Sequence, residues 1–234
     1  MTDFSRISRL KGEFEAEGLS RDILAAEVVY AARNKLSYLC KIGGCEAKSD
    51  MRFLRQIGVK DIVAPMIESA FAMSKYMDML PANAFDHVGV TIETRGAVER
   101  IEEILDAGTH LTEVTIGRTD LTASFSGEGV DQPETIAMVK TVAKAARTRG
   151  LKTTMGGSVG VGTRVLLNDD DELRSLLAAV ETRKCVIDVD TFLDPQALHD
   201  AFAVETELLQ MQATYAGEIA TAAESRIAQI NARL

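Results

Sequence analysis

Short apolar segments alternate with helical segments along most of the chain, and this alternation limits the folds open to it. Six segments are predicted to be strands because they are short, apolar and bounded by glycine, proline or charged residues. They are residues 35–44, 60–69, 87–94, 111–117, 151–157 and 184–190. Helical periodicity is typical of the segments between them. Such alternation predicts an α/β protein whose parallel strands are covered by helices.

The number of strands decides whether such a sheet can close. A closed (β/α)₈ barrel needs eight strands, typically in about 250 residues, whereas an open doubly wound sheet needs only five or six. Residues 4–34 are predicted to be helical, and residues 164–183 are predicted to contain a further helix. Neither segment adds a strand, so the periodicity alone leaves both architectures open.

The pattern changes at Pro195. Residues 196–234 contain one glycine, Gly217, no proline and no predicted strand. We therefore divide the chain into a barrel-like domain over residues 1–194 and a helical extension over residues 195–234. The extension carries an apolar stripe at helical spacing, made by Leu208, Met211, Tyr215, Ile219, Ala222, Ile230 and Leu234. Two interpretations remain open: the stripe packs on the domain, or it joins copies of the chain into a homo-oligomer.

Charge and hydropathy exclude some classes of partner. A net charge of −9 argues against binding nucleic acid or an anionic membrane, although a local cationic pocket can still bind a small anionic substrate. The sequence contains no run of about 18 apolar residues, so we expect no transmembrane helix. The first 18 residues lack the apolar core of a signal peptide, and we expect a cytoplasmic protein. The three cysteines have no spacing typical of a disulfide framework or a zinc site.

Polar residues follow several predicted strands, where an α/β domain binds its ligands. Glu93 ends the third strand and Asp120 follows the fourth, and consecutive strands lie about 5 Å apart if they are neighbours. Two carboxylates in such a place suit a hard cation such as Mg²⁺ or Mn²⁺. Lys41 lies on the first strand, where its charge suits a substrate carboxylate. The other candidates at strand ends are Glu46, Glu68, Arg118, Thr119, Asp188 and Asp190.

Each carboxylate also has a structural interpretation. Asp120 is placed to cap the helix that follows it, and Glu93 is placed to interact with a helix dipole. Either residue alone is explained in this way. Two carboxylates at matching strand ends favour a metal site.

Three segments resemble the HpcH/HpaI aldolase and citrate lyase β-subunit family. They are KIGGCEAKSDMRFLRQIGVKDIVAPMIESAFA (41–72), VTIETRGAVERIEEIL (90–105) and EVTIGRTDLTASF (113–125). This family is the metal-dependent branch of the phosphoenolpyruvate/pyruvate superfamily. The resemblance implies a TIM-type (β/α) barrel in which Glu93 and Asp120 ligate Mg²⁺ or Mn²⁺. It also implies reversible C–C bond cleavage at a pyruvate-like or acyl-CoA carbon.

The sequence departs from this family in two respects. Lys41 stands where the family usually has an arginine, and a lysine cannot form the bidentate contact of a guanidinium. The prediction contains no counterpart of the first two strands of the family, because residues 4–34 are predicted to be helical. We therefore expect an incomplete barrel with six clear strands, completed by helices or by a partner chain.

The leading hypothesis is a metal-dependent C–C lyase or aldolase acting on a small 2-oxo acid or a related anionic substrate. Lys41 and Arg118 would neutralise the substrate, and Glu46 would act as the general base. The predicted substrate site is completed by Gly117, Thr119 and Glu68. Two alternatives are an acyl-CoA ester lyase or thioesterase on the same scaffold, and a non-catalytic assembly or binding protein derived from it.

Overall fold

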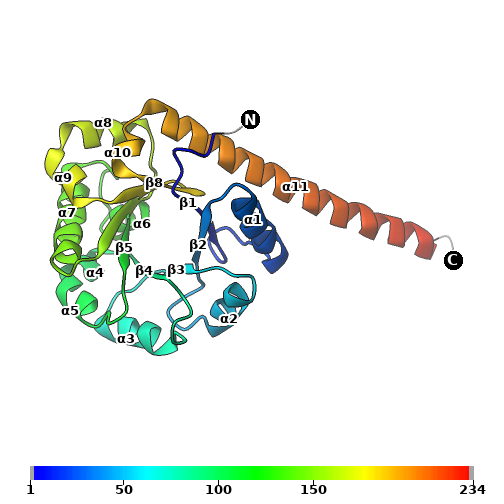
Figure 1. Ribbon diagram of the computed structural model, residues 1–234, viewed down its shortest axis with the longest axis horizontal. Coiled ribbons are helices and arrows are strands. Elements are labelled where there is room, and N and C mark those ends of the chain that lie inside the picture. The colour runs from blue at the N-terminus through cyan, green and yellow to red at the C-terminus, as the bar shows by residue number, and fades with distance from the viewer. Residues whose placement is uncertain (1–2, 232–234) are drawn as a thin grey trace.

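Eight strands close into a barrel in the computed structural model, which describes residues 3–231 (Figure 1). The strands follow one another around the barrel in chain order. They are β1 (Arg9–Glu13), β2 (Ser37–Lys41), β3 (Asp61–Ala64), β4 (His87–Ile92), β5 (Glu113–Gly117), β6 (Lys152–Gly156), β7 (Ala179–Glu181) and β8 (Cys185–Asp188). The predicted α/β barrel is confirmed, and it is complete rather than incomplete.

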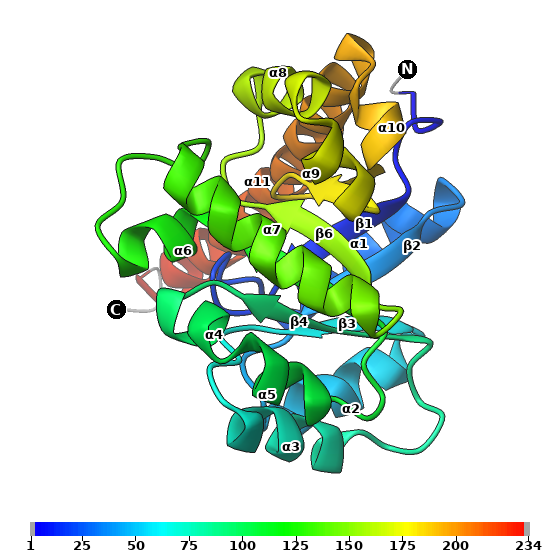
Figure 2. The same cartoon turned by 90° about the vertical axis from the view of Figure 1, so that its left-hand side faces the viewer.

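Helices surround the barrel on the outside (Figures 1 and 2). They are α1 (Arg21–Arg33), α2 (Lys48–Gln56), α3 (Ala70–Met79), α4 (Arg95–Glu99), α5 (Ile101–Asp106), α6 (Arg118–Ser124), α7 (Pro133–Thr148), α8 (Val161–Asp169), α9 (Asp171–Leu176), α10 (Val189–Phe192) and α11 (Pro195–Asn231). Apolar residues of the helices pack against the outward faces of the strands and form the main core.

Two strands are absent from the sequence prediction. β1 lies within residues 4–34, which we expected to be helical, and its inward residues Arg9, Lys11 and Glu13 are charged. These charges are satisfied by partners inside the barrel, so β1 lacks the apolar signal of a buried strand. β7 has only three residues and ends a segment predicted to be helical. The expectation of six strands is therefore wrong.

The last strand runs against its two neighbours. β8 pairs antiparallel with β7, with Val180 opposite Ile187, and antiparallel with β1, with Arg9 opposite Val186. Residues 182–184 alone separate β7 from β8, and so short a connection permits a hairpin but no parallel crossover. The prediction that all strands are parallel is wrong at β8.

This reversal moves two predicted site residues to the other end of the barrel. Asp188 ends β8 but pairs with Ala179, the first residue of β7. It therefore lies at the amino-terminal end of the parallel strands, and Ser8 Oγ donates a hydrogen bond to it at 2.8 Å. Asp190 lies in the first turn of α10, a helix whose N-cap is Asp188. Our placement of both residues among the strand ends that hold ligands is wrong.

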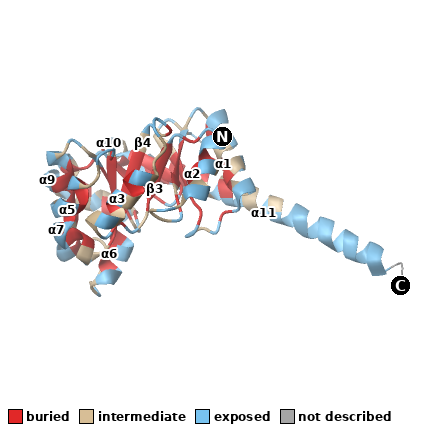
Figure 3. Ribbon diagram, turned by 90° about the horizontal axis from the view of Figure 1, so that it is seen from below, coloured by how far each residue is buried: buried red, intermediate tan, exposed pale blue. Residues whose placement is uncertain are grey.

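Helix α11 packs on the barrel only along its first part. Ala201, Val204 and Leu208 are buried, whereas residues 216–231 are exposed and project away from the body (Figure 3). Leu234, the last residue of the predicted stripe, lies outside the described residues. Within residues 3–231, no helix has the length and apolarity needed to cross a membrane.

Candidate active site

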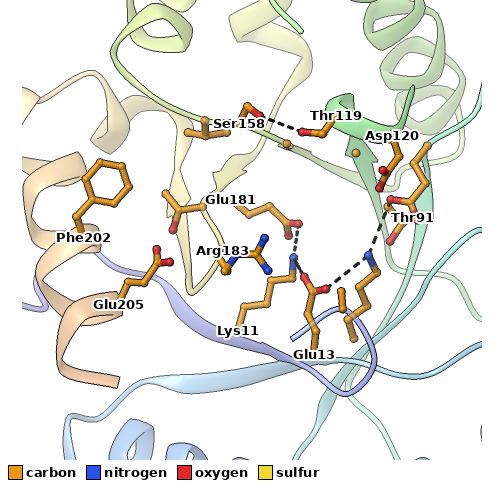
Figure 4. Close-up of a pocket in the computed structure, with 17 residues that line it drawn as sticks. Lys11, Glu13, Thr91, Thr119, Asp120, Ser158, Glu181, Arg183, Phe202 and Glu205 are labelled. Atoms are coloured by element: carbon orange, nitrogen blue, oxygen red, sulfur yellow. Dashed lines mark hydrogen bonds and ion pairs between the residues drawn. The ribbon is translucent and has the colours of Figure 1, made fainter. Parts of the chain in front are cut away.

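A pocket of about 450 Å³ opens at the carboxyl ends of the parallel strands (Figure 4). Its charged side chains come from strands β1, β2 and β7, from the residues that follow β4 and β7, and from helices α6 and α11. The charged residues that line it are Lys11, Glu13, Lys41, Glu93, Asp120, Glu181, Arg183 and Glu205. These are five carboxylates and three cations, so the lining carries an excess of negative charge when all groups are ionised.

Glu93 directly follows β4, and its side chain is almost fully buried. The N–H of Met66 donates a hydrogen bond to Glu93 Oε1 at 3.2 Å. Met66 has a φ of 53°, a left-handed conformation that is costly for a residue with a Cβ. The loop after β3 is therefore strained at the residue whose N–H orients this carboxylate.

Gly117 ends β5 and pairs with Gly156 at the end of β6. Thr119, two residues after Gly117, forms a hydrogen bond with Ser158 at the pocket rim, with 3.1 Å between the two hydroxyl oxygens. Asp120 is exposed in the first turn of α6, whose N-cap is Gly117. The helix-cap interpretation of Asp120 is therefore wrong, and its carboxylate lines the pocket.

Two lysines form an ion-pair network with the remaining carboxylates. Lys11 Nζ lies 2.7 Å from Glu13 Oε1 and 2.7 Å from Glu181 Oε1. Lys41 Nζ lies 3.7 Å from Glu13 Oε2 and 3.9 Å from Glu93 Oε2. Lys41 is thus held less tightly than Lys11, and it stands beside Glu93.

The network shifts the ionisation of its members. Burial and the nearby charge of Asp120 raise the pKa of Glu93, although Lys41 opposes them. Burial lowers the pKa of Lys11, but Glu181 and Glu13 outweigh it and the net shift is upward. Lys11 therefore stays an ammonium ion at neutral pH, and a protonated amine cannot attack a carbonyl. This geometry argues against Schiff-base chemistry at Lys11.

The structure brings five of the predicted site residues to this pocket and leaves three outside it. Lys41, Glu93, Gly117, Thr119 and Asp120 line the pocket. Arg118, Glu46 and Glu68 are not among its lining residues.

Arg118 is fully buried, and it stands in the chain between the lining residues Gly117 and Thr119. Its guanidinium donates to the carbonyl oxygens of Gly156 at 3.1 Å and Gly157 at 2.9 Å, and to Thr163 Oγ1 at 3.1 Å. It also forms an ion pair with Asp131. These contacts tie the loop after β6 to the start of α6, which is a positioning role.

Glu46 and Glu68 are exposed in the loops after β2 and β3. Glu46 lies just before α2, and the printed contact of Glu68 is through its carbonyl oxygen, which accepts a hydrogen bond from Arg100 Nη2 at 2.9 Å. Neither carboxylate faces the pocket in the part of the chain that the structure describes.

Four of the five charged lining residues that sequence reasoning missed come from the missed strands, and the fifth, Glu205, lies on α11. Lys11 and Glu13 lie on β1, Glu181 ends β7, and Arg183 lies in the turn before β8. Charges at positions 9, 11 and 13 repeat with the period of two that a strand requires. That alternation, inside a segment otherwise predicted as helix, was the available signal.

The donors of this pocket suit a divalent cation. Glu93 and Asp120 offer carboxylate oxygens, which Mg²⁺ and Mn²⁺ prefer, and Gly117 leaves space beside Glu93. Within residues 3–231, no three His, Cys, Asp or Glu side chains are grouped closely enough to form a metal cage. Mg²⁺ is commonly held by one or two carboxylates together with substrate and water, so the two-carboxylate arrangement fits.

The fold and the pocket define an α/β-barrel protein with a carboxylate-rich pocket at the carboxyl ends of its parallel strands. Residues 45–160 match the model of the HpcH/HpaI aldolase/citrate lyase family. The resemblance inferred from the sequence is thus confirmed, and it supports a function of the lyase or aldolase type.

Three solved structures with a similar fold show the range of this similarity. An HpcH/HpaI aldolase/citrate lyase family protein from Burkholderia cenocepacia J2315 is 16% identical with a TM-score of 0.63, over 88% of this chain and 86% of that chain. The citrate synthase SbnG is 12% identical with a TM-score of 0.60, over 69% and 73%. The HpcH/HpaI aldolase from Desulfitobacterium hafniense DCB-2 is 18% identical with a TM-score of 0.57, over 68% and 72%. A search of curated proteins finds no match.

Proposed function

We propose that the protein is a metal-dependent C–C lyase or aldolase acting on a small 2-oxo acid. The observation that carries this proposal is that Glu93 and Asp120, from neighbouring strand ends, line one pocket with Lys41 beside them. Their oxygens would hold Mg²⁺ or Mn²⁺, and the cation would supply the positive charge that stabilises an enolate oxygen.

The proposed reaction is balanced without a redox partner. In the direction of synthesis, a proton leaves the carbon next to the carbonyl of the 2-oxo acid. That carbon bonds to the carbonyl carbon of an aldehyde, and the aldehyde oxygen takes up a proton. Cleavage is the reverse.

The residues of this chain contribute binding and orientation. Lys41 supplies an ammonium group for the carboxylate of the 2-oxo acid, and Thr119 with Ser158 offers hydroxyls at the rim. Lys11 holds Glu13 and Glu181 in place. Arg118 positions the loop after β6, which contributes Gly157 and Ser158 to the pocket, and we propose no direct substrate contact for it. Glu46 and Glu68 have no contact with the pocket that would support their predicted roles.

The alternatives draw less support. The non-catalytic interpretation relied on missing strands, whereas the barrel has all eight. An acyl-CoA substrate needs a cluster of basic residues at the rim for its phosphates, and Arg183 is the one exposed cation among the lining residues that the structure describes.

We also propose that the protein is a homo-oligomer. Residues 216–231 of α11 are exposed, and a helical segment with no packed face is marginally stable in water. Ile219, Ile227 and Ile230 remain about half exposed along it. A second copy of the chain would bury these side chains.

Calorimetric titration of Mn²⁺ and Mg²⁺, with and without oxalate, tests the proposed function. Oxalate mimics the enolate of pyruvate, so we expect it to tighten metal binding. Asp120→Asn should abolish this binding and the activity without unfolding the protein, because Asp120 is exposed. Asp78→Asn, an exposed acid on α3, is the matched control and should bind like the wild type. Equal binding by both variants would overturn the proposal.

A further inference from the structure

A second cavity lies at the opposite end of the barrel from the candidate active site. Its volume is about 510 Å³. The first residue of every strand from β1 to β7 lines it, and all of these residues except Ala179 are polar or charged. In a regular (β/α)₈ barrel, layers of bulky apolar side chains fill the interior. A cavity lined by ionisable groups departs from that pattern.

An apolar layer separates this cavity from the candidate active site. The layer consists of four buried residues inside the barrel, Leu39, Val63, Ala179 and Val186. Ala179 lines the cavity, whereas Glu181, two residues further along β7, lines the active-site pocket. A ligand in the cavity would therefore be a different molecule from the substrate of the opposite pocket.

The buried charges of this cavity do not balance. Asp61 and Glu113 are almost fully buried, and both depend on one guanidinium, that of Arg9. Arg9 donates to the two oxygens of Glu113 at 3.0 and 2.7 Å, but it lies 3.5 Å from Asp61 Oδ2. With both carboxylates ionised, the cluster carries one excess negative charge. Burial makes such an uncompensated charge costly.

Asp61 is the group that lacks a close partner. Both oxygens of Glu113 accept a hydrogen bond from Arg9, whereas in the part of the chain that the structure describes no donor contacts Asp61 Oδ1. Burial and the charge of Glu113 raise the pKa of Asp61, although the neighbouring His87 and Arg9 oppose them. A positively charged donor beside Asp61 would restore the balance of charge.

A hydroxyl group in the same cavity also lacks a partner. Thr154 of β6 is almost fully buried and lines the cavity. Within residues 3–231, no protein group forms a hydrogen bond with its hydroxyl. The free oxygens of Asp61 and Thr154 are both acceptors, and an ammonium group offers three donors and no acceptor. The chemistry of the cavity therefore suits an ammonium group.

The size of the cavity favours an organic ammonium ion over a metal ion. Among the described residues, no three His, Cys, Asp or Glu side chains are grouped as metal ligands. A volume of about 510 Å³ lies within the range of roughly 300–1,000 Å³ that is typical of sites for small organic ligands. The exposed rim adds no net charge, because Lys60 and Lys152 are matched by Asp86 and Asp188.

We propose that this cavity binds a small primary amine, whose ammonium group lies against Asp61 and Thr154. The ammonium group supplies the positive charge that the cluster around Arg9 lacks. Ala179 and Val186, which line the cavity, offer an apolar surface to the alkyl part of the amine. The amine would bind here whether or not the opposite pocket carries out lyase chemistry.

Nuclear magnetic resonance of the histidines tests this site without an activity assay. The chain has three histidines. His87 lines the cavity, whereas His110 and His199 are exposed and are not among its lining residues. We expect butylamine, added to the full chain at constant pH, to shift the imidazole signals of His87 until the site is saturated. The signals of His110 and His199 should not change.

Two additives of the same series serve as controls. 1-Butanol has the same alkyl chain without the charge, and potassium chloride supplies a cation without the chain. Neither should cause a saturable shift of His87. An equal shift with potassium would overturn the amine in favour of an inorganic cation. No saturable shift with butylamine would mean that a proton on Asp61 or His87 balances the charge, and would also overturn the proposal.

Variants of the cavity test the contacts. Asp61→Asn keeps the shape of the side chain and leaves the Arg9–Glu113 pair intact, and it should weaken butylamine binding by at least about 10-fold. Thr154→Val is isosteric and should also weaken binding, which provides a second test if Asp61→Asn does not fold. Lys152→Gln removes a cation from the rim and should tighten binding by about twofold.

Asp78→Asn is the matched control, because Asp78 is an exposed acid on α3. This variant should bind butylamine like the wild type. Wild-type affinity in both Asp61→Asn and Thr154→Val would overturn the proposed position of the ammonium group.

Discussion

The Glu93 side chain fits against Gly117 because this glycine has no side chain. A Cβ atom at position 117 would lie 2.6 Å from Glu93 Oε2 and 3.1 Å from its Cβ. Gly117 ends the strand next to the one that Glu93 follows. The glycine therefore gives the carboxylate the position from which it lines the pocket.

Gly117→Ala should displace the Glu93 carboxylate and weaken Mn²⁺ binding by at least 10-fold, measured by calorimetry. Gly44→Ala is the control, because a Cβ there meets no atom within 4 Å. Wild-type affinity in Gly117→Ala would contradict a metal-binding role for Glu93 in this position.

Arg118→Met should lower the free energy of unfolding by about 2–4 kcal/mol, since it leaves the carbonyls of Gly156 and Gly157 and the Asp131 carboxylate without their donor. Urea denaturation measures this change. A variant with unchanged stability and no activity would instead indicate that Arg118 contacts the substrate directly.

The three cysteines should differ in reactivity toward a thiol reagent. Burial raises the pKa of Cys185 to about 12 and also raises the pKa of Cys40. At pH 8 both therefore remain protonated and inert in the folded protein, because the thiolate is the reactive form. We expect one equivalent to react, at the partly exposed Cys45, and three after denaturation. Rapid reaction of a second thiol under native conditions would show that the barrel opens there.

Ile219→Glu combined with Ile230→Glu should reduce the size of the assembly in light-scattering measurements. The two isoleucines are on one face of α11, and charges there would oppose burial against a second copy. Thr221 lies on the opposite face of the same helix. Thr221→Glu should therefore leave the mass of the assembly unchanged. A wild-type mass in the double variant would contradict association through this stripe.

Sequence patterns identified the parts of this fold whose signal is local. Glu93 and Asp120 were found because they follow β4 and β5, two short buried strands with a local run of valine and isoleucine residues. β1 was missed because its inward residues are charged and have their ionic partners on distant strands. Arg9 pairs with Glu113 of β5, and Lys11 pairs with Glu181 of β7. Such pairing is a property of the closed barrel and has no local pattern. The position of Arg118 shows the same limit, because the carbonyls that it binds follow a later strand.

The direction of β8 has a consequence for how the chain folds. The hairpin of β7 and β8 is local, but closing the barrel joins Arg9 to Val186, and contacts this distant in sequence form late because they cost the most loop entropy. Lys11 meets Glu181 only after that closure, so the pocket does not exist in a partly folded chain. A ligand that binds there should slow unfolding and leave the folding rate unchanged.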